Sequence, residues 1–587
     1  MHARPRRFLA LLALAAAVAA VTGCTQVKEL QQVFAHRPSE DMPAYKPVDV
    51  VMHDQHWPAD QRAWFYHTPQ GTELLPYKWF LALEQPQVKL FGTVAKFSDP
   101  EYLARFGFLT DAASATNPGG LPVGFAVDTV VDPESGETVQ VVGLTCAACH
   151  TGQLNYNGKG VRIDGGTAGA DLASFQTELG YAVAFTDKVP FRFDRFARAV
   201  LGEHATADEK KKLKADFEKV LNAGLAESNA ATAGNLYPTA GSFGRTDALG
   251  RIGNYVFGTE LNNANLRVAD APVKFPPLWY TSWFGWVQYN ASIQQPMVRN
   301  IGEALGVRAR VNLVDAAKLY QSTVNVKNVW QMEEQLAGQT AFDGLKPPAW
   351  PAEVFGPLDI GKAKQGAALY KLRCERCHMP EVNSAEIQDG QYWEAGLDGR
   401  RFLKLNVIPL DVVGTDPREA TDWAQRTAVT DKLGLGTVPA TEGLRVVTTK
   451  IRDMNYDAMK LTPEQRMEWS GYRADGVAAP LGYRARPLEG LWATPPFLHN
   501  GSVPSLYQLL LPAEQRDKTF YIGSREFDPK HVGFTTGKFD GGFLFDTSQP
   551  GNSNAGHEFR NGSGKGVIGP ELSDDERWAI IEYLKTM

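Results

Sequence analysis

Two short stretches decide the fold: Cys146-Ala147-Ala148-Cys149-His150 and Cys374-Glu375-Arg376-Cys377-His378. Both follow the pattern C-x-x-C-H, in which two thiols form thioethers to a porphyrin and the adjacent His ligates its iron. They predict two covalently bound c-type haems with His150 and His378 as iron ligands. The alternative, that the pairs are disulfides or zinc ligands, leaves the His directly after each pair unexplained.

The start of the chain carries an export signal. Basic residues precede an apolar run over residues 8–21, which is too short for a membrane span and ends in Val21-Thr22-Gly23-Cys24. Small residues before a Cys resemble a bacterial lipobox, so residues 1–23 are expected to be a lipoprotein-type signal peptide and Cys24 a lipid-bearing N-terminus. An ordinary signal with a nearby cleavage site is the alternative. Either way the protein is exported, and the lipobox predicts a periplasmic or cell-surface lipoprotein anchored to a membrane through Cys24.

The overall composition and charge exclude several classes of protein. The 587 residues carry a net charge of -6, with 43% hydrophobic and 21% charged residues, a globular balance that excludes intrinsic disorder. No basic cluster extends beyond residues 210–212, so we expect no nucleic-acid partner. Gly (55) and Pro (36) exceed average usage, which predicts a loop-rich fold.

The second motif lies in a unit with its own start and end. Residues 359–373 show helical spacing up to Cys374, and Ser573-Asp574-Asp575-Glu576 is a capping box that opens a closing helix. Residues 355–587 are therefore predicted to form one C-terminal cytochrome c-like unit with a large insertion. The Pro-rich stretch 346–351 ends the N-terminal haem domain, residues 24–350, because it cannot continue a helix.

The first motif has a different setting. Residues 137–144 alternate like a strand, and Tyr156-Asn157-Gly158-Lys159 is a hairpin turn signal. Further along, Thr206 caps a charged stretch through Lys219, which we interpret as a solvated surface helix.

Residues 482–506, GYRARPLEGLWATPPFLHNGSVPSL, together with the two motifs, are similar to the signature of bacterial di-haem cytochrome c peroxidases. Within that superfamily the chain most resembles rubber oxygenase, which cleaves polyisoprene with dioxygen, through residues 65–72, 146–166, 286–290, 295–297 and 302–306. The resemblance implies a mainly α, loop-rich fold with few short strands and two cytochrome c-like haem domains of the di-haem peroxidase type. The N-terminal haem would be the active site and the C-terminal haem would transfer electrons. A lipid anchor at Cys24 departs from a freely secreted enzyme.

The second haem needs a sixth ligand. His557 lies sixteen residues before Ser573, where a single-haem cytochrome often carries its distal ligand, and the resemblance also implies a distal His there. His557 is our candidate third iron ligand. The competitors are Met454, Met459, Met467 and His499.

For the first haem no distal ligand stands out, and an open position suits dioxygen or peroxide. Residues 278–289 hold six aromatics, among them Trp279, Trp283 and Trp286, and are a candidate catalytic pocket. Plain core packing is the alternative. Downstream, Glu303 is the acid that a peroxidase requires, whereas an oxygenase requires an apolar distal wall.

Three functions remain open. The whole-chain resemblance and the aromatic run favour the first, an oxygenase that acts on an apolar, alkene-like substrate with dioxygen. The second is a peroxidase that reduces hydrogen peroxide with electrons from a soluble cytochrome. The third is a non-enzymatic electron-transfer lipoprotein.

The motifs predict covalent attachment directly. Denatured protein is expected to keep two haems per chain by haem stain and mass, and Cys146→Ser or Cys374→Ser to disturb one haem each. Haem that acid-acetone extracts, or a single haem per chain, would contradict the prediction.

Overall fold

The computed structural model describes residues 37–87, 94–131 and 136–587. The predicted signal peptide and Cys24 lie outside the described residues. Within the described part, the longest helices run to 27 residues and the strands to seven, and each sheet has two or three strands. None of the helices described there is long and apolar enough to cross a membrane.

Two small sheets frame the first motif. One has the order β1 (Asp49–Met52), β6 (Lys159–Asp164), β5 (Thr151–Tyr156), and the other the order β2 (Leu75–Pro76), β4 (Thr138–Leu144), β3 (Phe125–Val131). The predicted strand before the motif is confirmed as β4, and the predicted turn as the β5–β6 hairpin. Its central residues Asn157 and Gly158 have φ of 50° and 79°, as a tight hairpin turn requires.

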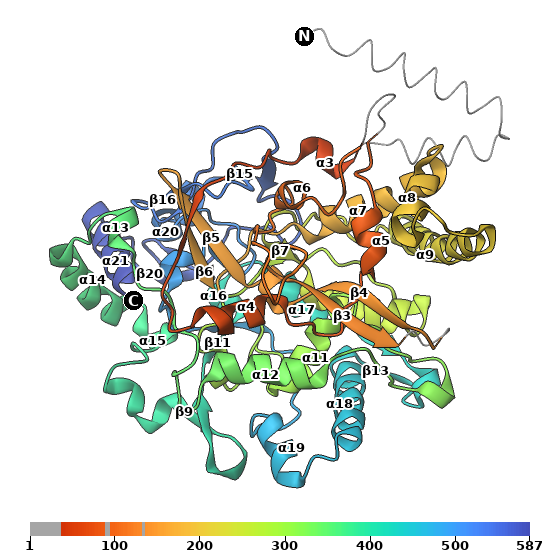
Figure 1. The fold of residues 1–587 in the computed structure, drawn as a ribbon. Helices are drawn as coiled ribbons and strands as arrows, with labels where there is room; N and C mark the ends of the chain where they lie inside the picture. Colours follow the sequence, from red (N-terminus) through yellow and green to blue (C-terminus); the bar gives the residue numbers. More distant parts are fainter. Residues whose placement is uncertain (1–36, 88–93, 132–135) are drawn as a thin grey trace, which may run out of the picture.

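An aromatic helical layer covers one end of the molecule (Figure 1). It contains α5 (Tyr77–Ala82), α6 (Pro100–Ala104), α7 (Leu172–Lys188), α8 (Arg192–Leu201) and α9 (Ala207–Ala233). The Thr206 capping box is confirmed. The solvated-helix interpretation is only half right, because α9 runs well past Lys219 and buries Leu213, Phe217 and Leu221. Phe217 packs against Trp79 and Phe196.

The insertion of the C-terminal unit covers helices of the N-terminal half. Its helices α18 (Ala440–Ala458) and α19 (Pro463–Trp469) lie beside α11 (Pro296–Gly306) and α12 (Val326–Ala337) in Figure 1. One apolar core joins them to α10 (Ala248–Gly253), with Ile301, Val329 and Leu444 among its buried members.

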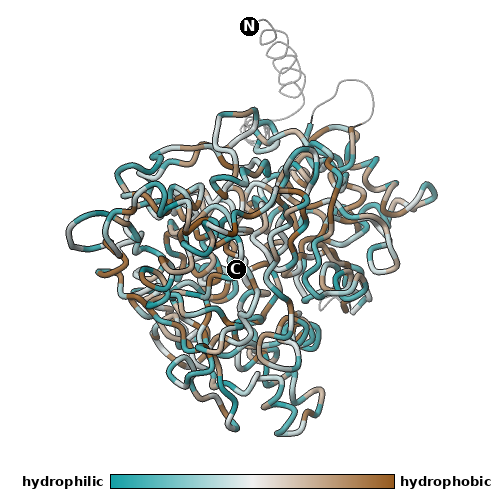
Figure 2. Tube along the Cα trace, turned by 90° about the vertical axis from the view of Figure 1, so that its left-hand side faces the viewer, coloured by the Kyte–Doolittle hydropathy of each residue, from teal (hydrophilic) through white to brown (hydrophobic). Residues whose placement is uncertain are grey.

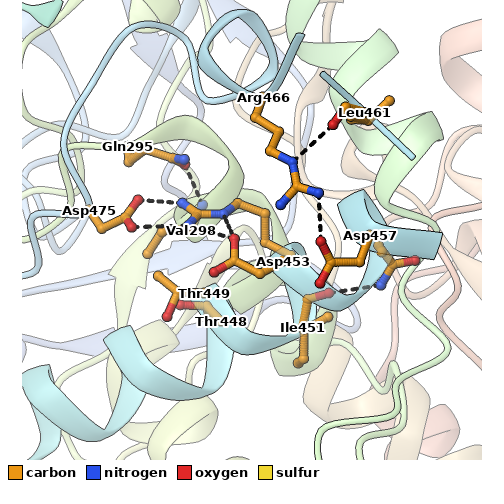
Figure 3. A network of polar contacts seen from close by, with 12 residues as sticks. Gln295, Val298, Thr448, Thr449, Ile451, Asp453, Asp457, Leu461, Arg466 and Asp475 are labelled. Atoms are coloured by element: carbon orange, nitrogen blue, oxygen red, sulfur yellow. Dashed lines mark hydrogen bonds and ion pairs between the residues drawn. The ribbon is translucent and has the colours of Figure 1, made fainter. Parts of the chain in front are cut away.

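A polar network fixes this insertion at the start of α11 (Figure 3). Arg452 of α18 pairs with Asp475 and with Asp453, and Arg466 of α19 pairs with Asp457. The residue after Asp475 accepts a hydrogen bond from Gln294 N at 3.0 Å. Gln295 then caps α11 by accepting from Val298 N at 2.7 Å. The insertion thus helps to set the position of α11.

The second motif sits in a pair of packed helices. α14 (Ile360–Arg373) leads into α15 (Glu375–His378), and α21 (Asp574–Thr586) crosses α14, as expected from the capping box at Ser573. The helices approach so closely that a Cβ at Gly366 would lie 1.9 Å from the carbonyl oxygen of Ala579. The C-terminal half contains further short elements. They are α13 (Ala352–Phe355), α16 (Leu410–Val413), α17 (Arg418–Gln425), α20 (Leu506–Leu509), β11 (Asn406–Pro409) paired with β14 (Gly482–Ala485), and β15 (Thr519–Ile522) paired with β18 (Phe543–Asp546).

One hydrophobic core crosses the predicted boundary between the two haem domains. It contains Phe65 from α4 (Ala59–His67), Phe355 after the Pro-rich linker, and Trp492 and Ile580 from the C-terminal unit. In Figure 2 the hydrophilic colour is concentrated in outer loops. The two halves therefore share their apolar interior rather than meeting at a polar surface.

Gly366→Ala is expected to destabilise the fold by about 1–3 kcal/mol, because the new methyl group meets a backbone oxygen that cannot move away cheaply. The matched control is Gly180→Ala on α7, where a Cβ meets nothing within 4 Å and helix propensity predicts a gain of up to about 1 kcal/mol. Urea unfolding of both variants checks the signs. Equal stabilisation would show that the α14–α21 approach tolerates a side chain.

Candidate functional site

The first motif presents a histidine prepared for metal binding. It begins as a 3-10 turn, Cys146–Ala148, that Thr145 caps. The His150 Nδ1 atom lies 2.7 Å from the carbonyl oxygen of Pro276. A carbonyl can only accept, so Nδ1 carries the proton and Nε2 keeps its lone pair. Burial lowers the pKa of His150 to about 4, which keeps the ring neutral.

The second motif repeats the arrangement. The His378 Nδ1 atom donates to the carbonyl oxygen of Arg486 at 2.8 Å, and burial lowers the pKa of His378. Cys146, Cys149, Cys374 and Cys377, the four cysteines of the described residues, are all free thiols. Free thiols beside a neutral, oriented imidazole fit covalent haem attachment.

His557 faces His378. Their ring centroids are 6.0 Å apart at an interplanar angle of 71°, which leaves room for one metal ion at about 2 Å from each ring. Burial lowers the pKa of His557 to about 3, helped by His378 and Arg516. The predicted partner is thus brought to the right place, and its ligation of iron stays a prediction.

A buried arginine holds the loop that carries His557. The guanidinium of Arg516 donates to the carbonyl oxygens of Asn554, Gly556 and His557 at 2.7 to 2.9 Å. The competing ligands lie elsewhere: His499 stacks on Tyr483 at 4.1 Å, and Met454, Met459 and Met467 lie on or beside α18 and α19.

A cavity opens at the first motif. Cys146 and His150 line it, and α11 and α12 provide most of the remaining wall. The lining residues are Arg299, Asn300 and Glu303 from α11, Val329, Met332, Glu333 and Leu336 from α12, and Gln70 and Leu278 from elsewhere. Glu303 is therefore where the sequence analysis expected an acid.

The cavity holds two carboxyl groups in different states. Burial raises the pKa of Glu303, although Arg299 opposes the shift, and Gln288 Nε2 donates to Glu303 Oε1 at 3.0 Å. Burial alone would also raise the pKa of Glu333, but Arg299, Arg473 and hydrogen bonds from Ser282 and Asn300 together outweigh burial and lower that pKa. Such a separation assigns different roles to two acids in one site.

The three predicted tryptophans are not among the residues that line this cavity. Trp279 is fully buried and donates to the carbonyl oxygen of Asp164 at 2.8 Å. Trp283 donates to the carbonyl oxygen of Ala337 at the end of α12, at 2.8 Å. Trp286 lies against Gly476. Their structural setting is that of packing residues around the site, and a catalytic role for them stays a prediction.

Sequence reasoning missed Gln70, Met332, Glu333 and Arg516. Gln70 Nε2 lies 2.7 Å from Cys146 Sγ and 3.2 Å from Met332 Sδ, and only its place in the stretch 65–72 gave a signal. Nothing in the local sequence of the other three distinguishes them.

Comparison with known proteins supports the cytochrome assignment. The family described as RoxA-like, cytochrome c-like matches residues 482–521, which supports a RoxA-like cytochrome c family and implies covalent haem. The uncharacterized protein y4iJ of Sinorhizobium fredii is 46% identical over 573 residues, covering 94% of this chain and 95% of that protein. This chain belongs to the same family as y4iJ. The uncharacterized protein y4iM of the same organism is 27% identical over 326 residues, 53% of this chain and 63% of that protein.

The matched segment contributes directly to the second site. It contains Arg486, whose carbonyl orients His378, and the buried His499 and Arg516. This segment thus orients a histidine that lies more than a hundred residues earlier in the chain.

His557→Ala is expected to leave haem attached at Cys374 and Cys377 but to remove one low-spin signal from the electron paramagnetic resonance spectrum, because attachment does not depend on the sixth ligand. His531→Ala is the control, since His531 is partly exposed and paired with Asp528. A spectrum unchanged in His557→Ala would return the assignment to another side chain.

Proposed function

We propose that the protein is a c-type haem oxidoreductase that reduces hydrogen peroxide at the His150 site, with electrons supplied through the His378–His557 site. The observation that carries the proposal is that Glu303, Arg299 and Glu333 lie together in the wall of the cavity at His150. Haem supplies the exchange of electrons with peroxide when it is bound. The net reaction converts one molecule of hydrogen peroxide, two protons and two electrons into two molecules of water.

The chain's own residues supply protons and charge. The raised pKa of Glu303 favours the protonated form of its carboxyl, from which a proton can pass to the departing oxygen. Arg299 places a fixed positive charge in the same wall, where it stabilises negative charge that develops on the peroxide. Glu333 and Asn300 hold Arg299 in place through the ion pair and a hydrogen bond from Arg299 Nε to Asn300 Oδ1 at 2.9 Å.

The wider organisation belongs to the same proposal. We propose a fold of the di-haem peroxidase superfamily, with haem domains at residues 24–350 and 355–587. Export and acylation at Cys24 would place the protein in the periplasm or at the cell surface, where a soluble cytochrome can donate electrons. The two C-x-x-C-H motifs and the two oriented histidines support a haem at each site.

An oxygenase of apolar, alkene-like substrates is the second candidate. The RoxA-like match supports it, and Leu278, Val329, Met332 and Leu336 give the cavity an apolar side. In that case dioxygen rather than peroxide would be the oxidant, and Glu303 would not be needed as a proton donor.

Glu303→Gln is expected to lower peroxide turnover with reduced cytochrome c by about 10²–10⁴-fold, because the amide cannot donate the proton. Glu334→Gln, an exposed neighbour on α12, is the matched control and should keep wild-type turnover. Wild-type turnover should fall as pH rises through the raised pKa of Glu303, because the ionised form has no proton to give. Two other outcomes would favour the competing functions. Alkene cleavage that changes more on altering the bulk of Trp279, Trp283 or Trp286 than on Glu303→Gln would favour the oxygenase. A spectrum in which both irons carry protein ligands on both faces would favour simple electron transfer.

A further inference from the structure

A group of cationic side chains lies deep in the molecule between the two motif histidines. Arg245 and Lys274 face each other across the strand pair β7 (Arg245–Thr246) and β8 (Val273–Lys274). Arg484 lies on β14, and Arg486 follows two residues later. The phenol of Tyr289 is close enough to both arginines for their charges to act on its pKa.

The group contacts His378 directly and lies one residue away from the backbone partner of His150. The carbonyl oxygen of Arg486 accepts from His378 Nδ1. The Arg486 Nη1 atom lies 3.4 Å from the carbonyl oxygen of Pro277, and the preceding Pro276 accepts from His150 Nδ1. The cations are therefore placed where groups attached at either motif come together.

Within the described residues, none of these cations has a carboxylate within ion-pair distance. Lys274 Nζ donates to the carbonyl oxygens of Thr494 and Pro496 at 2.5 and 2.8 Å. Arg484 Nε donates to the carbonyl oxygen of Gln288 at 2.5 Å, and Arg486 Nε to that of Pro487 at 3.1 Å. Carbonyl oxygens satisfy hydrogen-bonding capacity but carry no net negative charge.

Several donors in the group have no partner at all in this part of the chain. They are buried and comprise Arg245 Nε and Nη1, Arg484 Nη1 and the Tyr289 hydroxyl. Burying an uncompensated cation or an unmatched donor is costly, so an interior with several of both indicates a missing anion.

The pKa values of these groups are also those expected for buried cations that lack an anionic partner. Burial lowers the pKa of Lys274 to about 7, with Arg486 adding to the shift. It lowers the pKa of Arg484 to about 9. An anion beside them would reverse these shifts and stabilise the charged forms.

We propose that Lys274, Arg484 and Arg486 form a carboxylate-binding site that holds the propionate groups of the c-type haems attached at the two motifs, with the Tyr289 hydroxyl as a neutral donor. This rests on the proposed function, which places a haem at each motif. Propionates are the anionic groups that haem brings into the interior, and arginine pairs with carboxylates through two parallel hydrogen bonds. The same site would fix the haems relative to His150 and His378, because Arg486 accepts a hydrogen bond from His378 and contacts Pro277, next to the residue that accepts from His150.

The test compares Arg484→Gln and Arg486→Gln with wild-type holoprotein. Both variants are expected to keep covalent haem, to show a lower reduction potential for at least one haem, and to shift the ionised-carboxylate band in the infrared difference spectrum between reduced and oxidised protein. The potential falls because removing a nearby positive charge favours the oxidised iron. Arg486→Lys, which keeps the charge, should recover most of the potential but not the band position, because lysine lacks the planar fork.

Arg426→Gln is the matched control, a buried arginine that donates to the carbonyl oxygens of Gly250 and Asn265 and lies outside this group. It should change stability without changing either spectrum or potential. If the glutamine variants do not fold, Tyr289→Phe removes one uncharged donor and should still shift the carboxylate band. Unchanged potentials and carboxylate bands in folded Arg484→Gln and Arg486→Gln would overturn the inference.

The two proposals fail in different ways. Wild-type protein that carries haem but does not turn over peroxide would remove the proposed activity and leave the carboxylate site standing if the bands shift. An arginine group that binds inorganic phosphate in the holoprotein, with haem carboxylate bands unaffected by Arg486→Gln, would show a different anion site and overturn this one.

Discussion

The hydrogen bond from the Nδ1 atom of each motif histidine to a backbone carbonyl is the constraint on which the sites depend. It fixes the tautomer of His150 through Pro276 and that of His378 through Arg486. A histidine in the other tautomer would direct a proton, not a lone pair, toward the metal. The partners come 126 and 108 residues later in the chain, so the ligands are correct only when the whole chain has folded.

This dependence explains why the two halves interlock. A pair of independent cytochrome units would each complete its own site, whereas here the segment after β14 orients His378 and contacts Pro277 beside the other histidine's partner. The insertion carrying α18 and α19 likewise lies over α11, which bears Arg299 and Glu303. The shared apolar core that joins Phe65 to Trp492 has the same consequence. Loosening one half would therefore be expected to disturb the ligands of the other.

The features that could be predicted from the sequence are those that depend on residues close together in the chain. The two motifs, the capping boxes at Thr206 and Ser573 and the turn at Asn157 each depend on residues a few positions apart, and their structural elements are present. The sequence also singled out Glu303 and His557, which the structure brings to the cavity and to His378. Glu333 and Arg516 could not be found in this way, because their roles come from contacts 34 to 41 residues away. The tryptophans of residues 278–289 show the converse problem, since a local aromatic run does not reveal which cavity it faces.

The two sites differ in the groups that lie opposite each motif histidine. His378 meets a second neutral imidazole on a loop held by Arg516, an arrangement that in the proposed function would fill both faces of an iron and favour electron transfer over substrate binding. His150 instead opens on a cavity with a carboxyl of raised pKa and an arginine, which favours chemistry that consumes protons. The buried cations between them connect the two arrangements, because Arg486 accepts a hydrogen bond from His378 and also reaches Pro277, next to the residue that orients His150. In the proposed carboxylate site the propionates would offset the charge of these cations, so one set of side chains would both hold the two haems and set the potential around them.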